Sequence, residues 1–229
     1  ILHALTKNEH AEQLHQMEKI AKSVQSMLSA ATEDSALIST SLYMDNSLQD
    51  FVSRQYASPQ DYFSSYREYI HNSLLQGVSR ITNSVIRVYA DNETLINGSE
   101  FARLSTVSQE PWYQQYTADG YSPRLLFSYD ETDGRQVLFL RGMNGLYSNK
   151  AERLLCIEIN YSTLDRDFQN MGYNDSVYVC SGNRILLTNA IPNYRWQPYD
   201  TFSPSDSVGL SQHFTLYGED LDIYVMEPS

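Results

Sequence analysis

The chain has 229 residues and a formal net charge of -12, because 28 Asp and Glu residues outnumber 16 Lys and Arg residues. A chain of this length can bury a core that needs neither a metal nor a disulfide to fold. Its negative charge repels phosphate backbones and anionic lipid headgroups, which argues against nucleic acid as a partner. No apolar run reaches the roughly 18 residues of a membrane span. The sequence begins at Ile1 with neither an initiator methionine nor a signal-peptide pattern, so we expect a fragment of a longer protein.

The first part of the chain follows one long helical pattern, with apolar residues on a heptad seam that only Ser35 interrupts. Neither Gly nor Pro occurs before Pro59. Such a seam either packs on its own domain or also pairs with a second copy of the chain, and the pattern leaves both interpretations open. The seam positions are Leu14, Met17, Ala21, Val24, Leu28, Ala31, Ile38 and Leu42.

Two further patterns follow the long helix. Ser58 is a favourable N-cap and Pro59 a favourable first residue for a second helix, which we expect over residues 59–75. Apolar residues then alternate with the period of strands, and turn residues between two such runs predict a hairpin of residues 84–90 and 94–96.

The rest of the chain alternates strand patterns with polar turns and one short helix. We therefore predict an α+β fold: a long N-terminal helix over residues 1–42, an α/β module over residues 43–161, and a smaller β-rich module over residues 162–229. The expected elements are an antiparallel meander of strands 125–129, 136–142 and 153–160 with a turn at 144–150, a helix 162–171 capped by Ser162, and hairpins of 176–180 with 184–188 and 210–217 with 221–226.

Several short stretches occur in a characteristic order. They are Ser41-Leu42-Tyr43 with Leu48-Gln49-Asp50-Phe51, then Ile86-Arg87-Val88-Tyr89-Ala90-Asp91-Asn92, Pro111-Trp112-Tyr113, Tyr129 with Thr132 and Gly134, and Ile157-Glu158-Ile159-Asn160 leading to Leu164. Together with the order of elements, they resemble the double Cache domain, a tandem PAS-like extracellular sensor domain of bacterial receptors. The likeness covers nearly the whole chain and is greatest to YesM-type sensor histidine kinases.

The resemblance implies that both modules are PAS-like, with residues 43–161 forming the membrane-distal, ligand-binding module. It also implies a place on the extracytoplasmic face of the bacterial plasma membrane, flanking transmembrane helices outside this chain, and a homodimer in the full-length receptor. The expected function is small-molecule sensing for a two-component sensor histidine kinase. A chemoreceptor ectodomain is the alternative within sensors, and a secreted carbohydrate-binding or adhesion module is the alternative from another class.

Family members that bind amino acids carry an Arg two residues before the Trp and an Asp in the strand that corresponds to residues 153–160. Those positions are Glu110 and Glu158 here. A carboxylate at position 110 cannot bind a ligand carboxylate, so we expect a cationic, sugar-like or peptide-amine ligand and not a free amino acid. A Glu110 that is merely solvated in a loop is the alternative.

Four aromatic residues complete the predicted ligand site: Trp112, Tyr113, Tyr121 and Tyr129. Flat aromatic faces and hydroxyls suit sugars and small amphipathic ligands. Arg141 lies in an apolar strand, where it is either a pocket cation or a strand-end residue that reaches solvent.

The sequence offers no motif for catalysis. No pair of carboxylates is singled out for glycoside hydrolysis, no histidine lies near a nucleophile motif, and no glycine-rich phosphate loop is present. We therefore expect neither catalysis nor a cofactor. Cys156 and Cys180 form no zinc-binding pattern, and they are either two buried thiols or a disulfide between the modules.

Overall fold

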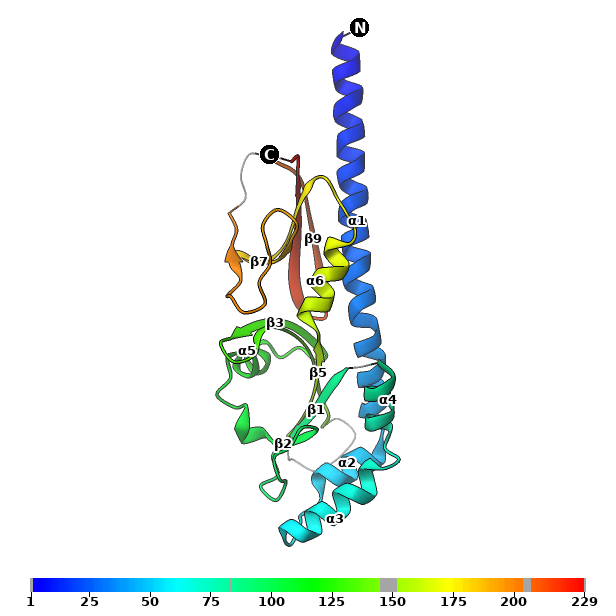
Figure 1. Ribbon diagram of the computed structural model, residues 1–229, viewed down its shortest axis with the longest axis vertical. Coiled ribbons are helices and arrows are strands. Elements are labelled where there is room, and N and C mark those ends of the chain that lie inside the picture. The colour runs from blue at the N-terminus through cyan, green and yellow to red at the C-terminus, as the bar shows by residue number, and fades with distance from the viewer. Residues whose placement is uncertain (1, 83, 145–151, 204–206, 229) are drawn as a thin grey trace. The chain divides into compact units, whose positions relative to one another are not determined.

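The computed structural model describes residues 2–82, 84–144, 152–203 and 207–228, and it divides into two compact units (Figure 1). Unit 1 comprises residues 1–31, 129–135 and 161–229, and unit 2 comprises residues 32–128 and 136–160. The long helix therefore contributes residues to both units. The module boundaries predicted from the sequence stay predictions.

Helix α1 (Leu2–Tyr43) runs through Ser35 without a break, and the Ser35 side chain is buried. In unit 1, Met17 packs so closely on Gly209 that a Cβ at position 209 would lie 2.5 Å from the Met17 Sδ. Leu14 is 44% exposed, whereas most of the seam after it is buried within the chain's own units. The buried seam residues are Met17, Ala21, Val24, Leu28, Ile38 and Leu42. Pairing with a second copy stays a prediction.

Three short helices of unit 2 follow: α2 (Asn46–Ser53), α3 (Pro59–Ile70) and α4 (Leu74–Thr82). The predicted start of α3 is confirmed, because the Ser58 side chain accepts a hydrogen bond from the Asp61 backbone N–H at 3.1 Å. The prediction of one helix to residue 75 is wrong. The Ser73 Oγ accepts from the Gln76 backbone N–H at 3.1 Å, and this local hydrogen bond starts α4 as a separate helix.

The sheet of unit 2 has the strand order β2-β1-β5-β4-β3. Its antiparallel meander is confirmed for β4 and β5, whereas β1 and β2 pair in parallel. The strands are β1 (Val85–Ala90), β2 (Phe101–Arg103), β3 (Arg124–Asp130), β4 (Gly134–Gly142) and β5 (Arg153–Ile159). Of the predicted turn at 144–150, residues 145–150 lie outside the described residues.

The predicted hairpin of residues 84–90 and 94–96 is wrong, because β1 pairs with β2 instead. The side chain of Asn92 accepts from the Thr94 backbone N–H at 3.0 Å and donates to the carbonyls of Val52 and Arg54 at 3.0 and 2.9 Å. These bonds hold the segment after β1 against α2. Leu95 is fully buried there and packs as a core residue outside any strand.

One face of the unit 2 sheet is covered by helix α5 (Pro111–Asp119) and the preceding 3-10 turn (Leu104–Thr106). Gly120 ends α5 in a left-handed conformation, with φ of 71°, where a glycine is favoured. The residues buried between these segments are Tyr89, Ala102, Leu104, Val107, Trp112, Tyr116, Leu126, Leu138, Leu140, Leu154 and Cys156.

Unit 1 contains helix α6 (Tyr161–Gln169) and a second five-stranded sheet, in the order β8-β7-β6-β10-β9. Its strands are β6 (Ser176–Ser181), β7 (Arg184–Thr188), β8 (Asp200–Thr201), β9 (Val208–Leu216) and β10 (Glu219–Met226). Both predicted hairpins are confirmed. The predicted cap at Ser162 is wrong, because the helix already begins at Tyr161, whose buried side chain is anchored in the core. The predicted α+β fold is confirmed.

Cys156 and Cys180 are both buried, free thiols, so the alternative of a disulfide between them is not realised. Burial raises the pKa of each thiol to about 12. Among the described residues, no helix combines the length and the apolar character that crossing a membrane requires.

Candidate ligand pocket

A surface pocket of about 360 Å³ lies in unit 2 where β4 and β5 leave the sheet. The two strands pair in antiparallel register up to this end, where Arg141 lies opposite Leu155 and Gly142 lies opposite Leu154. Helix α5 and the last residue of α1 contribute aromatic side chains. The lining residues are Tyr43, Tyr116, Ser122, Arg141, Gly142, Asn144, Glu152 and Arg153.

Gly142 allows the pocket to be this narrow. A Cβ at this position would lie 3.2 Å from the Tyr116 Oη, so the Tyr116 hydroxyl would have to shift by a few tenths of an ångström to admit it. The Gly142 backbone N–H donates to the Ser122 Oγ at 3.0 Å, which holds the segment before β3 against the end of β4.

Arg141 is the accessible cation of the pocket. Its guanidinium carbon lies 4.7 Å from the centre of the Tyr43 ring, and its Nη1 is 3.4 Å from the Thr40 Oγ1 and 3.5 Å from the Ser39 Oγ. Stacking on an aromatic ring and weak contacts to hydroxyls position a guanidinium without neutralising it. Within the described residues, no carboxylate forms an ion pair with Arg141.

Glu152 is the anion of the pocket. Its carboxylate accepts a hydrogen bond from the Tyr113 Oη at 3.2 Å, and its backbone carbonyl accepts from the Asp91 N–H at 2.8 Å. Burial, and after it the charge of Glu152 and the hydrogen bond to it, raise the pKa of Tyr113 to about 12. Tyr113 therefore stays a neutral donor to Glu152 at physiological pH.

Beneath the pocket, a buried network fixes the start of β5. The Arg153 side chain is 1% exposed, and its Nη1 donates to the Gln49 Oε1 at 3.4 Å. The Gln49 amide donates in turn to the Met143 carbonyl at 3.2 Å, and the Asn144 side chain accepts from the Arg153 N–H at 2.9 Å. These bonds set the positions of the strand ends that carry Arg141 and Glu152.

Of the sequence-predicted site residues, Arg141 lines this pocket. Tyr113 does not line it, and its hydroxyl donates to the lining residue Glu152. Trp112 is 6% exposed and packs against Tyr89 in the core, with ring centres 6.2 Å apart. Tyr121 is 59% exposed after the end of α5.

The remaining three predicted residues lie elsewhere. Glu110 precedes α5 at its N-cap position, where its side chain makes no capping hydrogen bond. Glu158 lies towards the other end of β5, 3.8 Å from the Arg87 Nη1. Tyr129 groups with unit 1, where its hydroxyl donates to the Trp196 carbonyl at 3.1 Å. Their roles in ligand binding stay predictions.

Sequence reasoning missed Glu152, Tyr43 and Tyr116. A charged residue directly before a strongly apolar strand was the available signal for Glu152, since such a residue lies at the end of the sheet. Tyr43 and Tyr116 gave no comparable signal, because aromatic residues on helices are usually core residues. Among the described residues, no group of three or more His, Cys, Asp and Glu side chains could hold a metal ion.

No protein-family model and no curated protein sequence matches the chain. The fold is similar to that of the ligand-binding domain of the Campylobacter jejuni chemoreceptor Tlp3 in complex with L-valine, with a TM-score of 0.54 and 11% identity over 96% of this chain and 94% of that chain. The Tlp3 sensory domain with isoleucine bound gives a TM-score of 0.53 and 12% identity over the same shares.

A third similar structure is the periplasmic domain of Vibrio cholerae LuxQ, with a TM-score of 0.49 and 11% identity over 90% of this chain and 96% of that chain. At such identities, the likeness to Tlp3 defines the fold: a long N-terminal helix followed by two antiparallel-rich sheets.

Proposed function

We propose that this chain is the ligand-binding sensor domain of a transmembrane receptor and that the unit 2 pocket binds a small zwitterionic molecule. The observation that carries the proposal is the pairing of Arg141 and Glu152 in one pocket, on adjacent strand ends. A guanidinium binds a ligand carboxylate through two hydrogen bonds, and a carboxylate binds a ligand ammonium. The pocket volume of about 360 Å³ suits a small ligand.

Amino acids belong to the proposed class of ligand. The sequence-based argument against a free amino acid rested on Glu110 alone, and Glu110 lies at the N-cap position of α5 and not among the pocket residues. The similar Tlp3 structures hold L-valine and isoleucine, so the comparisons give that argument no support. In our proposal, Arg141 binds the ligand carboxylate, a role that the family resemblance places at position 110.

The receptor type that we propose is a sensor histidine kinase on the extracytoplasmic side of a bacterial plasma membrane, as the likeness to YesM-type proteins implies. A chemoreceptor ectodomain is the second candidate, because the Tlp3 chemoreceptor domain shares the fold over 96% of this chain. The coding sequence that flanks this segment separates them. A phosphoacceptor-histidine region after a second transmembrane helix supports the kinase, and a methyl-accepting signalling region supports the chemoreceptor.

We also propose that this domain binds its ligand without catalysing a reaction. Turnover of a panel of glycosides and esters that is abolished by replacing a single carboxylate would contradict this part.

L-valine is the first probe for the pocket. A ligand at 100 times its dissociation constant stabilises the folded protein by about 2.7 kcal/mol, which a thermal-shift measurement detects. Two analogues test the charge pairing: isovalerate lacks the ammonium, and isobutylamine lacks the carboxylate. We expect L-valine to raise the melting temperature and both analogues to fail at the same concentration.

Variants then connect binding to the two pocket charges. Arg141→Gln and Glu152→Gln should each abolish the shift, whereas Glu93→Gln, a change at an exposed carboxylate outside the pocket, should leave it intact. If L-valine and a panel of other amino acids and dipeptides give no shift, or if a shift survives both pocket variants, the proposed ligand site is wrong.

A further inference from the structure

The paired strands β4 and β5 carry the ligand pocket at one end and a buried polar network at the other. At the pocket end, β4 supplies Arg141 and Gly142. At the opposite end, the last pair in register is Val137 with Ile159. Arg135 lies two residues before Val137, and Tyr161 lies two residues after Ile159. Both belong to unit 1. One pair of strands therefore connects the two sets of residues through the backbone.

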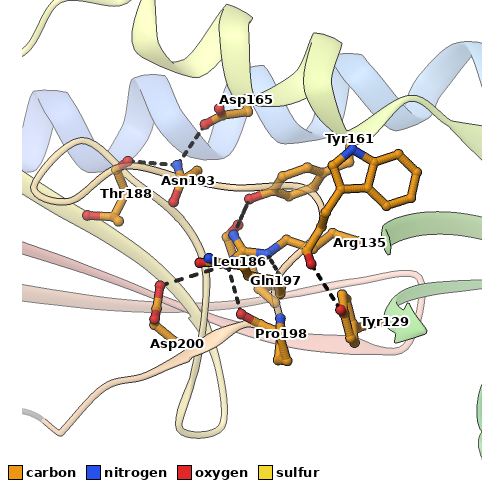
Figure 2. A network of polar contacts seen from close by, with 11 residues as sticks. Tyr129, Arg135, Tyr161, Asp165, Leu186, Thr188, Asn193, Gln197, Pro198 and Asp200 are labelled. Carbon is orange, nitrogen blue, oxygen red and sulfur yellow. Dashed lines mark hydrogen bonds and ion pairs between the residues drawn. The ribbon is translucent and has the colours of Figure 1, made fainter. Parts of the chain in front are cut away.

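The buried side chain of Arg135 makes several hydrogen bonds, which we call the Arg135 network (Figure 2). The side chain of Arg135 is 1% exposed, and its guanidinium donates to the Gln197 carbonyl at 2.8 Å, to the Pro198 carbonyl at 2.9 Å and to the Tyr161 Oη at 2.9 Å. The Asp200 carboxylate lies 3.8 Å from it. The cation is thus satisfied only while all these acceptors converge on it.

Tyr161 links this cation to the sheet of unit 1. Its hydroxyl accepts from Arg135 and donates to the Leu186 carbonyl in β7 at 2.8 Å (Figure 2). The guanidinium carbon also lies 5.5 Å from the centre of the Tyr161 ring and 4.9 Å from that of Tyr199. Arg135 in β4 and Tyr161, the first residue of α6, are therefore bonded to each other and, through Leu186, to β7.

We expect the Arg135 network to open as one unit. A buried guanidinium that loses one acceptor keeps the full cost of desolvation, so a shift of β4 against β5 opens the network as a whole. Exchange of the Arg135 backbone amide measures whether the network is closed, because this N–H donates to the Arg195 carbonyl at 2.7 Å. When the network opens, that amide becomes exchangeable with solvent.

We propose that the Arg135–Tyr161 network is the conformational switch that reads the state of the unit 2 pocket through the β4–β5 pair. This inference rests on the proposed function, because the switch responds to ligand binding in the unit 2 pocket. A ligand that bridges Arg141 on β4 and Glu152 beside β5 holds the two strand ends in register and favours the closed network. Loss of the Arg141 anchor on α1 loosens β4 and favours the open network. Arg135 and Tyr161 act as positioning residues and touch no ligand.

Amide hydrogen exchange on the full 229-residue chain tests the switch without any ligand. In Arg141→Gln, we expect exchange of the Arg135 amide to accelerate about tenfold, as for a local opening shifted by one decade. The Phe202 amide, which donates to the Asn183 carbonyl at 2.7 Å in the same unit and outside the network, should keep its rate. Arg103→Ala, on the far edge strand β2, is the matched control and should change neither amide.

The reverse experiment uses reciprocity, since coupled equilibria affect each other equally. Tyr161→Phe removes the hydroxyl that joins Arg135 to Leu186 and keeps the ring. We expect faster exchange of the Gly142 amide at the pocket, because its bond to the Ser122 Oγ opens more often. An unchanged Arg135 amide in Arg141→Gln, or equal acceleration of the Arg135 and Phe202 amides, overturns the proposal.

The two proposals fail in different ways. Absence of L-valine binding with a tenfold effect on the Arg135 amide contradicts the proposed ligand and leaves the switch standing. If L-valine binds but neither L-valine nor Arg141→Gln changes the exchange rate of the Arg135 amide, the switch is contradicted. The proposed ligand site then still stands.

Discussion

Arg135 and Tyr161 lie two residues beyond the last registered pair of β4 and β5, and the Arg135 Nη1 donates to the Tyr161 hydroxyl at 2.9 Å. Removing this cation leaves two backbone carbonyls, those of Gln197 and Pro198, without their donor in a partly buried site. We expect Arg135→Met to lower the free energy of unfolding by about 3 kcal/mol, since each unsatisfied group costs about 1 to 3 kcal/mol. Urea unfolding measures the change.

Arg166→Met is the matched control for this substitution. Arg166 lies on α6 in the same unit, and its side chain is exposed. Surface substitutions usually change stability by less than about 0.5 kcal/mol. Equal stabilities of the two variants would show that the Arg135 network adds no stability beyond what a packed methionine supplies in its place.

Gly134 tests how closely the tip of the β3–β4 hairpin packs on the segment that contains Arg195. A Cβ at position 134 would lie 2.6 Å from the Arg195 carbonyl oxygen, and the residue has φ of +71°. That same oxygen accepts from the Arg135 N–H, so it cannot move without losing a hydrogen bond. We expect Gly134→Ala to destabilise the protein by well over the roughly 1 to 2 kcal/mol that a left-handed conformation costs alanine.

Gly182 provides the comparison that isolates the steric part. It also has a positive φ, of +58°, but a Cβ there would meet nothing within 4 Å. Gly182→Ala therefore carries only the conformational cost, and thermal unfolding of both variants compares them directly. A loss of stability at Gly134 no larger than that at Gly182 would rule out the close packing of the hairpin tip.

Periodicity predicted most elements here because local patterns dominate them. The helix seam, the cap at Ser58 and the hairpins of unit 1 each follow from residues close in sequence. The hairpin after β1 failed for the opposite reason: Asn92 bonds to Val52 and Arg54, residues of the preceding helical region that no local pattern reveals. Sequence reasoning did not find Glu152 for a similar reason, since the pairing of β4 with β5 brings Arg141 and Glu152 to one pocket.

Of the aromatic residues predicted for the ligand site, Trp112 lies in the core and Tyr121 on the surface. The free energy of unfolding of their alanine variants distinguishes the two positions. Trp112 is 6% exposed in the unit 2 core, so Trp112→Ala should cost about 3 to 5 kcal/mol of unfolding free energy. Tyr121 is 59% exposed, so Tyr121→Ala should cost less than about 0.5 kcal/mol. A Trp112→Ala protein as stable as the parent would mean that this ring lines an accessible site after all.

Buried tyrosines make the fold sensitive to alkaline pH. Burial raises the pKa of Tyr161 to about 12, although the nearby charge of Arg135 and its hydrogen bond act in the opposite direction, and burial likewise raises the pKa of Tyr89 to about 12. Unfolded tyrosine titrates near 10.0. The unfolded state therefore loses its proton first, and the stability that depends on the neutral hydroxyl is complete below pH 10 and is lost as the pH rises to about 12.

Tyr161→Phe isolates one such residue. Two pH units correspond to about 2 to 3 kcal/mol, so the loss of unfolding free energy at high pH should be smaller by up to about this amount in the variant than in the parent. Cys156 and Cys180, whose pKa values burial raises from 9.0 to about 12, contribute equally in both proteins and cancel in the comparison. Tyr121→Phe, at an exposed ring, should follow the parent curve. Urea unfolding from pH 8 to pH 12, with tyrosinate absorbance as a second signal, supplies the curves. Parallel curves for the parent and Tyr161→Phe would mean that the Tyr161 hydroxyl is not buried as the Arg135 network requires.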